Sequence, residues 1–266
     1  MLKLEHDFHV HTHLSSCAKD SATIAHYVAK ARELGIQKLG LADHMWDAAI
    51  PGASKWYSVQ DFAHISTIRE EIAAVEHEGI EFLIGAEGEY DYAHRGIALS
   101  EAVAEQLDFL IVPNSHTHMT MPKDFYEPHR KHAEFMLDAF YDIINSPLSK
   151  YVTAIPHPFM AVCCPYPNAQ AIAEITDDEF KRCFDAAAER GIAMEINPNH
   201  FRGALPALYE SQLMRMYRHI KESGCKFTIG TDSHSDGGHE HYRQAYVAIG
   251  LLGLREDDFH PLTRVK

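Results

Sequence analysis

Short apolar segments alternate with longer segments of helical periodicity along the whole chain. We expect strands at Leu4–Val10, Lys38–Ala42, Glu81–Ala86, Phe109–Val112, Tyr151–Ile155, Ile192–Ile196 and Lys226–Gly230. We expect helices at Ala22–Leu34, Gln60–His77, Ser100–Leu107, Pro128–Ile144, Asp177–Glu189, Leu208–Ser223 and Tyr242–Leu251. This alternation is typical of βαβ units and of a parallel sheet.

Local signals agree with these boundaries. Thr176 and Glu179 form a capping-box pattern at a helix start, and Ser21 precedes the first helix. Glycines such as Gly35 and Gly191 follow predicted helix ends, where a left-handed residue is favoured. Seven units leave little of the chain for a second domain, and no linker-like stretch rich in Pro, Gly or Ser separates them, so we expect one domain over residues 1–266. An open doubly wound sheet and a closed barrel both fit this pattern.

Side chains that can bind a metal ion follow each predicted strand. In parallel α/β folds the carboxyl ends of the strands carry the site. A barrel would bring all seven ends to one centre, whereas an open sheet would spread them along a line, so the pattern favours a barrel. In chain order these side chains are His9 and His11; Asp43 and His44; Glu87; His116 and His118; His157; Glu195 and Asn197; Asp232 and His234.

The His9–His11 pair has a geometric meaning of its own. Residues i and i+2 of a strand point to the same face, so two imidazoles meet at one point. Asp232 and His234 repeat this spacing after the last strand, which adjoins the first strand in a closed barrel. Each residue alone has a plainer interpretation, for example His157 as a hydrogen-bonded structural histidine. Burying all of them without cations would be costly, so together they predict a metal centre.

The size of the predicted ligand set indicates more than one ion. One zinc ion takes about four ligands, and the candidates number about twice that. A mixed histidine and carboxylate set without thiolate clusters suits zinc, manganese or iron better than magnesium or calcium. We therefore expect two or three divalent ions.

The overall charge restricts the partners. Lys and Arg number 24 and Asp and Glu number 38, which gives a formal net charge of −14. Such a chain lacks the basic surface that long nucleic acids or anionic membranes need. No apolar run is long enough to span a bilayer, and the N-terminus does not read as a signal peptide. Five irregularly spaced cysteines fit a reducing compartment, so we expect a cytoplasmic protein.

Five motifs in order resemble the PHP (polymerase and histidinol phosphatase) family, from about residue 7 to 235. They are Asp-Phe-His-Val-His-Thr at 7–12, Ala-Asp-His at 42–44, Gly-Ala-Glu at 85–87, His-Pro at 157–158 and Gly-Thr-Asp-Ser-His at 230–234. The resemblance implies a distorted (β/α)7 TIM-like barrel and a metal-dependent phosphoesterase with two or three metal ions.

The resemblance also implies a division of the ligands. One ion would be held by His9, His11, Glu87 and Asp232, a second by Glu87, His116 and His157, and a third by His44 and His234. The family often has a histidine or aspartate in the loop after the first strand, where this chain has Cys17. Cys17 is a candidate ligand, Asp20 could replace it, and a weak third site is the remaining alternative.

The expected reaction is hydrolysis of a small phosphomonoester by a metal-bridging hydroxide, with Glu87 and Asp232 in the catalytic set. His200 is a candidate proton donor to the leaving group, and Arg202 and Arg95 are candidates for binding the phosphoryl group. The loop 45–57 contains both tryptophans and should border the pocket.

Chain length matches the histidinol-phosphatase branch, which would place the protein in histidine biosynthesis. The alternatives are a phosphodiesterase, a nucleotide phosphatase or an amidohydrolase on the same scaffold, or a non-catalytic metal-binding module. The oligomeric state is not predicted.

Overall fold

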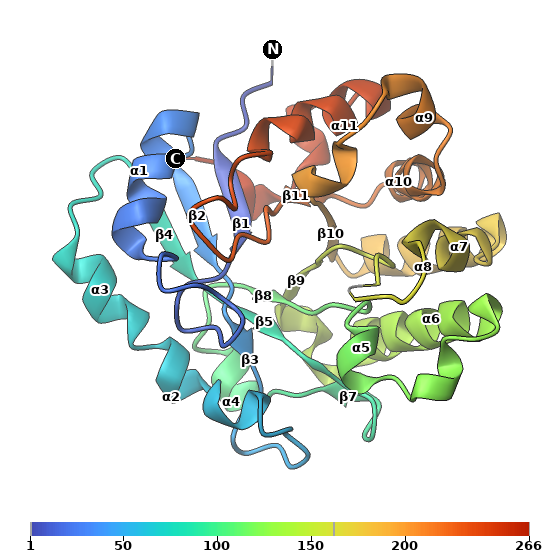
Figure 1. Ribbon diagram of the computed structural model, residues 1–266, viewed down its shortest axis with the longest axis horizontal. Helices are drawn as coiled ribbons and strands as arrows, with labels where there is room; N and C mark the ends of the chain where they lie inside the picture. The colour runs from blue at the N-terminus through green and yellow to red at the C-terminus, as the bar shows by residue number, and fades with distance from the viewer. Residues whose placement is uncertain (1, 162, 266) are drawn as a thin grey trace.

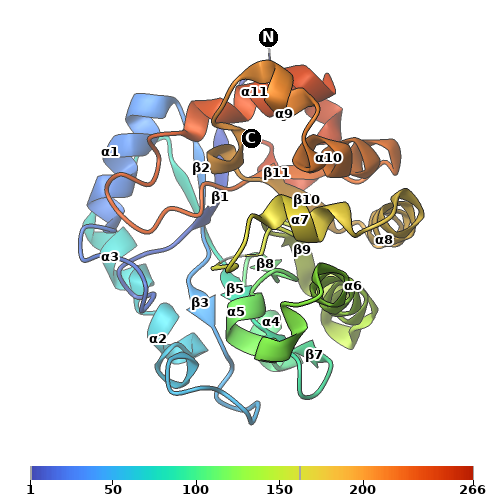
Figure 2. The ribbon, with the colours of Figure 1, turned by 45° about the vertical axis from the view of Figure 1, so that its right-hand side comes forward.

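A computed structural model describes residues 2–161 and 163–265 of the chain. Parallel strands form its centre and helices surround them, as the two views show (Figures 1 and 2). One sheet has the order β1-β2-β4 and the other the order β11-β10-β9-β8-β5-β3. The strands are β1 (His6–Val10), β2 (Lys38–Leu41), β3 (His44–Met45), β4 (Glu81–Ile84), β5 (Ala86–Gly88), β8 (Leu110–Ile111), β9 (Val152–Ile155), β10 (Ala193–Ile196) and β11 (Phe227–Ile229).

Two of the central strands are interrupted and continue in the second sheet. β2 leads into β3, and β4 leads into β5, with backbone hydrogen bonds carried across the breaks. At the second break, a Cβ on Gly85 would lie 2.5 Å from the ring of Phe109 and from its carbonyl oxygen. Only glycine permits this close approach. The seven predicted strands are therefore all present, in the predicted order.

The first and last strands join at the end that carries the candidate ligands. The amide of His11 donates to the carbonyl of Ser233 at 2.9 Å, and the amide of Asp232 donates to the carbonyl of His9 at 2.8 Å. The Asp7 carboxylate strengthens this junction by accepting hydrogen bonds from the amide and hydroxyl of Thr231 at 3.0 and 2.6 Å. The fold is the expected distorted α/β barrel, and the open-sheet alternative does not describe it.

The helices confirm most of the prediction and correct part of it. The segment 60–77 forms two helices because the Ser66 and Thr67 hydroxyls bond back to the carbonyls of Phe62 and His64. The first helix is capped by Thr23 rather than Ser21. The helices are α1 (Ile24–Leu34), α2 (Phe62–Ile65), α3 (Ile68–Ala74), α4 (Glu101–Ala104), α5 (Thr117–Thr120), α6 (His129–Asn145), α7 (Asn168–Ala173), α8 (Asp177–Glu189), α9 (Leu205–Tyr209), α10 (Gln212–Glu222) and α11 (Ala245–Leu252). Short α5, α7 and α9, and the antiparallel pair β6 (Tyr90–Asp91) and β7 (Gly96–Ile97), were not expected.

Apolar side chains fill the space where the strands converge. A small cluster separate from the main core draws on five strands and their flanks, and the rings of Phe8 and Phe109 meet edge to face at 5.4 Å within it. Its buried members are Phe8, Ala42, Phe109, Ile111, Ala154 and Ala193. The barrel therefore has a packed interior, and polar ligands gather at one end of it. Among the described residues, the helices are all too short or too polar to cross a membrane.

Candidate metal centre

Glu87 lies at the middle of the candidate site. Its side chain extends from β5 and is only 1% exposed. Imidazole nitrogens approach both of its carboxylate oxygens. Oε2 lies 3.0 Å from His44 Nδ1, 3.4 Å from His11 Nε2 and 3.5 Å from His9 Nε2, and Oε1 lies 3.2 Å from His157 Nε2 and 3.4 Å from His116 Nε2.

The two histidines of β1 face the same point, as their spacing predicts. His9 Nε2 and His11 Nε2 are 3.0 Å apart, and both rings are fully buried. Oδ1 of Asp232 lies 3.4 Å from His9 Nε2 and 3.2 Å from His11 Nε2. Asp232 reaches this position with a left-handed backbone, φ 55°, immediately after the junction of the first and last strands. Barrel closure thus completes this cluster.

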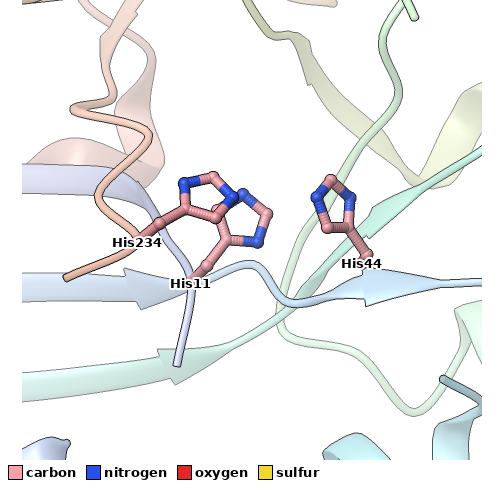
Figure 3. A group of neighbouring side chains, drawn as sticks. All are labelled: His11, His44 and His234. Atoms are coloured by element: carbon pink, nitrogen blue, oxygen red, sulfur yellow. The ribbon is translucent and has the colours of Figure 1, made fainter. Parts of the chain in front are cut away.

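A second cluster consists of histidines alone. The rings of His11 and His234 stack at 4.0 Å, and His44 lies 4.4 Å from His11 (Figure 3). His44 belongs to β3, whereas His234 follows the last strand, so three separate segments supply this group. In total, four groups could hold an ion, each with donor atoms within 4.8 Å of one another. They are His11–His44–His234, His9–Glu87–His157, His9–His11–Asp232 and His44–Glu87–His116.

The structure therefore brings together eight of the nine residues expected to be metal ligands. The clusters overlap more than the resemblance implies, because His9, His11, His44 and Glu87 each belong to two groups. Histidines lie near both carboxylate oxygens of Glu87, an arrangement compatible with the expected bridging role. The ninth residue, Cys17, is exposed and lies outside the four groups.

Most of the candidate ligand rings have a hydrogen-bond partner at the ring nitrogen that faces away from the clusters. Such a partner fixes which nitrogen carries the proton and turns the other toward the ion. His9 Nδ1 lies 2.7 Å from Glu195, and His157 Nδ1 lies 2.7 Å from the Ser115 hydroxyl. His11 Nδ1 is 3.1 Å from Ser15 Oγ, whose hydroxyl donates to Asp43 at 2.6 Å. Asp43 and Glu195, both found at strand ends in the sequence, thus lie behind the ligand rings and outside the four groups.

Glu89 is a functional candidate that sequence reasoning missed. It lies 3.0 Å from His116 Nδ1 and is buried. The available signal was its position two residues after Glu87, because alternate residues of a strand share a side.

The donor atoms fit a divalent cation. Glu87 Oε2 and His44 Nδ1 are buried and lack a hydrogen-bond partner among the described residues, although they are only 3.0 Å apart. Leaving two such groups unsatisfied in a protein interior is costly. A cation held between them would satisfy both. Nitrogen and carboxylate donors suit zinc, manganese or iron.

The neighbouring histidines keep the Glu87 and Asp232 carboxylates ionised. Burial alone would raise the pKa of Glu87, but His116 and His9 outweigh it and hold that pKa well below its usual value. His9 and His11 likewise hold the pKa of Asp232 well below its usual value, although burial alone would raise it. Burial opposes protonation of His116, yet Glu87 and Glu89 raise its pKa to about 9. Cation binding therefore competes with protons for these imidazoles, and affinity should fall at low pH.

An aromatic cavity of about 330 Å³ opens beside the clusters. Trp56 forms part of its wall and meets the His44 ring edge to face at 5.1 Å, as expected for the tryptophan loop. Trp46 is instead buried, and its indole donates to the carbonyl of Ile50 at 2.9 Å. The described lining contains neither lysine nor arginine: it consists of Cys17, His44, Trp56, Tyr57, His116, His118, Met119, Cys163, Asp232 and His234.

Cys17 lines this cavity without reaching the four groups. Burial and the nearby Glu87 and Asp232 carboxylates raise the pKa of its thiol to about 12. Its position outside the four groups does not support the expected role of Cys17 as a ligand. Asp20, the alternative, is exposed and also outside the groups.

The basic candidates lie in different places. Arg95 is exposed, pairs with Asp142 at 3.1 Å and lines a separate cavity of about 550 Å³, so its position does not support contact with the phosphoryl group. Arg202 is exposed and donates to Asn199, whose amide donates to the Thr231 carbonyl at 2.9 Å, just before Asp232.

Burial, with His157, lowers the pKa of His200, the candidate proton donor, to about 4. A neutral His200 carries no imidazolium proton to give at pH 7.

A parallel barrel with a buried histidine and carboxylate centre at the carboxyl ends of its strands defines a metal-dependent α/β-barrel enzyme. A family model for the PHP domain matches residues 7–199, and the chain belongs to this family. It is 27% identical over 248 residues to a probable phosphatase of Thermoanaerobacter sp. (strain X514), covering 93% of this chain and 86% of that one. A probable phosphatase of Thermoanaerobacter pseudethanolicus matches equally well.

Solved structures show the same fold. Histidinol phosphate phosphatase of Lactococcus lactis, complexed with zinc, L-histidinol and phosphate, matches with a TM-score of 0.69 and 20% identity over 97% of this chain and 95% of that one. A putative histidinol phosphatase of Listeria monocytogenes matches with a TM-score of 0.63 and 14% identity, covering 91% and 99% of the two chains.

Proposed function

We propose that this protein hydrolyses a small phosphomonoester with the help of two or three divalent cations. The observation that carries the proposal is the clustering of seven predicted ligands around an eighth, Glu87, at one end of the barrel. The broader class, metal-dependent phosphatase, is supported by the PHP domain match, by the probable phosphatases and by this cluster.

The residues divide naturally among the cations. His9, His11 and Asp232 would hold one, and His44 and His234 would contribute to another. Glu87 would bridge, with His116 and His157 at its Oε1. Once bound, such cations supply a water of lowered pKa as nucleophile and neutralise the phosphoryl oxygens.

The chain itself positions the substrate and limits its size. The cavity of about 330 Å³ is at the small end of ligand pockets, so a compact leaving group fits and a polymer does not. Trp56 and Tyr57 offer flat apolar walls to that group. The described lining has no lysine or arginine, so the bound cations and the histidines must balance the phosphate charge. Arg202, connected through Asn199 to the residue before Asp232, is the basic side chain proposed to assist.

The first substrate to test is histidinol phosphate. The Lactococcus lactis protein of similar fold was crystallised with histidinol and phosphate, and the aromatic wall here suits an imidazole-bearing leaving group. A role in histidine biosynthesis would follow from that substrate.

The test combines metal analysis with a substrate panel. Purified protein would be loaded separately with zinc, manganese and iron, its metal content measured, and phosphate release followed from histidinol phosphate, p-nitrophenyl phosphate, nucleotides and bis-p-nitrophenyl phosphate. We expect monoester turnover that disappears on chelation. Preference for the bis-ester would identify a phosphodiesterase instead. Bound metal without turnover of any of these esters would overturn the proposal.

The ligand assignment has its own control. His9→Ala should lose metal and activity together, whereas Cys17→Ser should retain the wild-type metal stoichiometry. Full activity and metal content in His9→Ala would refute the assignment.

A further inference from the structure

A buried carboxylate connects the cavity wall to one of the metal-binding clusters. Oε2 of Glu89 receives the hydroxyl hydrogen of Tyr57 and lies 3.0 Å from Nδ1 of His116. Its other oxygen accepts the amide of Tyr90 at 2.8 Å. Glu89 is 1% exposed, and no lysine or arginine pairs with it among the described ion pairs. Its charge is therefore balanced by hydrogen bonds from groups of fixed position.

We propose that Glu89 is a positioning residue for metal binding and that Tyr57 acts with it as one unit. The inference rests on the proposed role of His116 as a ligand. When Nδ1 of His116 donates to Glu89, the neutral ring presents the lone pair of Nε2 on its opposite side. That nitrogen lies 3.4 Å from Glu87, at the cluster of His44, Glu87 and His116.

Tyr57 gives this arrangement a link to the cavity. Its ring packs edge to face on Trp56 at 4.6 Å and on His44 at 6.3 Å, while its hydroxyl holds Glu89. Two ligands of one cluster are therefore supported by neighbouring residues of the same loop: His44 by ring packing and His116 through Glu89. A change in the cavity wall that displaces Tyr57 should therefore change the metal affinity of this cluster.

Two substitutions separate the hydrogen bonds from the packing. Glu89→Gln keeps the size of the side chain but removes its charge. Tyr57→Phe removes only the hydroxyl and keeps the ring that forms part of the cavity wall. Partners of this kind affect metal affinity by about 10- to 100-fold. We expect about a tenfold weakening of zinc binding in Glu89→Gln, measured by competition with a chelating dye, and a smaller loss in Tyr57→Phe.

The double variant tests whether the two residues act as one unit. Residues in one hydrogen-bond network give non-additive effects, so Glu89→Gln with Tyr57→Phe should bind zinc no more weakly than Glu89→Gln alone. Nitrogen NMR of the histidine rings supplies a second measurement. In the zinc-loaded protein the His116 ring should carry its proton on Nδ1, and this preference should be lost in Glu89→Gln.

Asp47→Asn is the matched control. Asp47 anchors the same loop by accepting hydrogen bonds from the amide and hydroxyl of Ser100, but it contacts none of the clusters. The substitution alters the hydrogen bonds to Ser100 and leaves the Tyr57–Glu89 hydrogen bond in place, so zinc affinity should be unchanged. An equal loss of affinity in Asp47→Asn, additive losses in the double variant, or unchanged affinity in Glu89→Gln would each overturn the inference. These readouts need no substrate, so failure of the proposed phosphatase activity would remain distinguishable.

Discussion

Nδ1 of His9 lies 2.7 Å from Oε2 of Glu195, a contact between residues 186 positions apart in the chain. Both side chains are buried, and Oε1 of Glu195 also accepts the amide of His157 at 3.2 Å. One carboxylate from β10 thus holds a ligand from β1 and the backbone of a ligand that follows β9. This contact turns Nε2 of His9 toward Asp232 and Glu87.

Removing the charge of Glu195 should weaken metal binding. Glu195→Gln keeps the shape but loses the strong acceptor for His9, so we expect about a 10- to 100-fold loss of metal affinity or activity. Isothermal titration of the metal-free protein with zinc would measure it. Glu189→Gln, an exposed change at the end of α8, is the control and should have no effect. Wild-type affinity in Glu195→Gln would show that the orientation of His9 does not depend on this carboxylate.

Chelation should destabilise the protein. A ligand that binds only the folded state adds stability according to its concentration relative to its dissociation constant, about 4 kcal/mol at a thousandfold excess. Adding a chelator should therefore lower Tm by several degrees, and excess zinc or manganese should restore it. Glu87→Gln should reduce this metal-dependent gain. A Tm that chelator leaves unchanged at several metal concentrations would argue against a resident cation.

His6 should make the fold sensitive to acid. Burial lowers its pKa from 6.5 to about 3, and its Nε2 accepts the amide of Ile229 at 3.1 Å. Because the unfolded chain binds the proton more readily, the stabilising effect of a neutral His6 is complete above pH 6.5 and is lost as pH falls. Between pH 6.5 and 5 the loss is about 2 kcal/mol. Urea unfolding should show a steeper acid dependence in wild type than in His6→Gln, and identical dependence would contradict the assignment.

The two candidate arginines should differ in their effect on substrate binding. Arg202→Met should raise KM about tenfold, the equivalent of about 1.4 kcal/mol, if its charge assists the phosphoryl group. Arg95→Met should leave KM unchanged, because Arg95 pairs with Asp142 and lines a different cavity. Steady-state kinetics on the best monoester of the panel decide this. An increase in KM for Arg95→Met alone would reverse the assignment.

Cys17 should be dispensable for metal binding but sensitive to bulk. Its side chain lines the cavity without joining the four groups. Cys17→Ser should keep metal stoichiometry, and Cys17→Trp should reduce turnover by filling the cavity. A lower metal content in Cys17→Ser would restore Cys17 as a ligand.

The clustering of the candidate ligands could be predicted because it depends on local order, whereas the choice among the strand-end side chains came from the family resemblance. Strand periodicity places His9 and His11 on one face, and parallel topology places Glu87, His116 and His157 at the same end of the barrel. These rules require only the positions of the strands, which apolar runs indicate well. The helix boundaries differ from the predicted ones where hydroxyl groups such as those of Ser66 and Thr67 compete locally with the helix.

The roles of the supporting residues could not be predicted because they depend on contacts with distant parts of the chain. Nothing local to Glu89 indicates that Tyr57 and His116 both lie within hydrogen-bond distance of its carboxylate. The need for glycine at position 230 is a second property that the local sequence does not indicate. A Cβ there would lie 2.1 Å from Oε2 of Glu195 and 2.5 Å from Cβ of His9, so glycine is required by residues far away.

By itself, the sequence predicted the α/β barrel class from periodicity and strand order and, through the family resemblance, eight candidate ligands that the structure brings together. Only the tertiary structure decided how those ligands overlap around Glu87, which carboxylates orient them and which arginine lies away from the site. Those relationships arise where β1 meets the segment after β11 and where loops pack across the barrel. Such contacts depend on side-chain packing in three dimensions, which strand order alone does not determine.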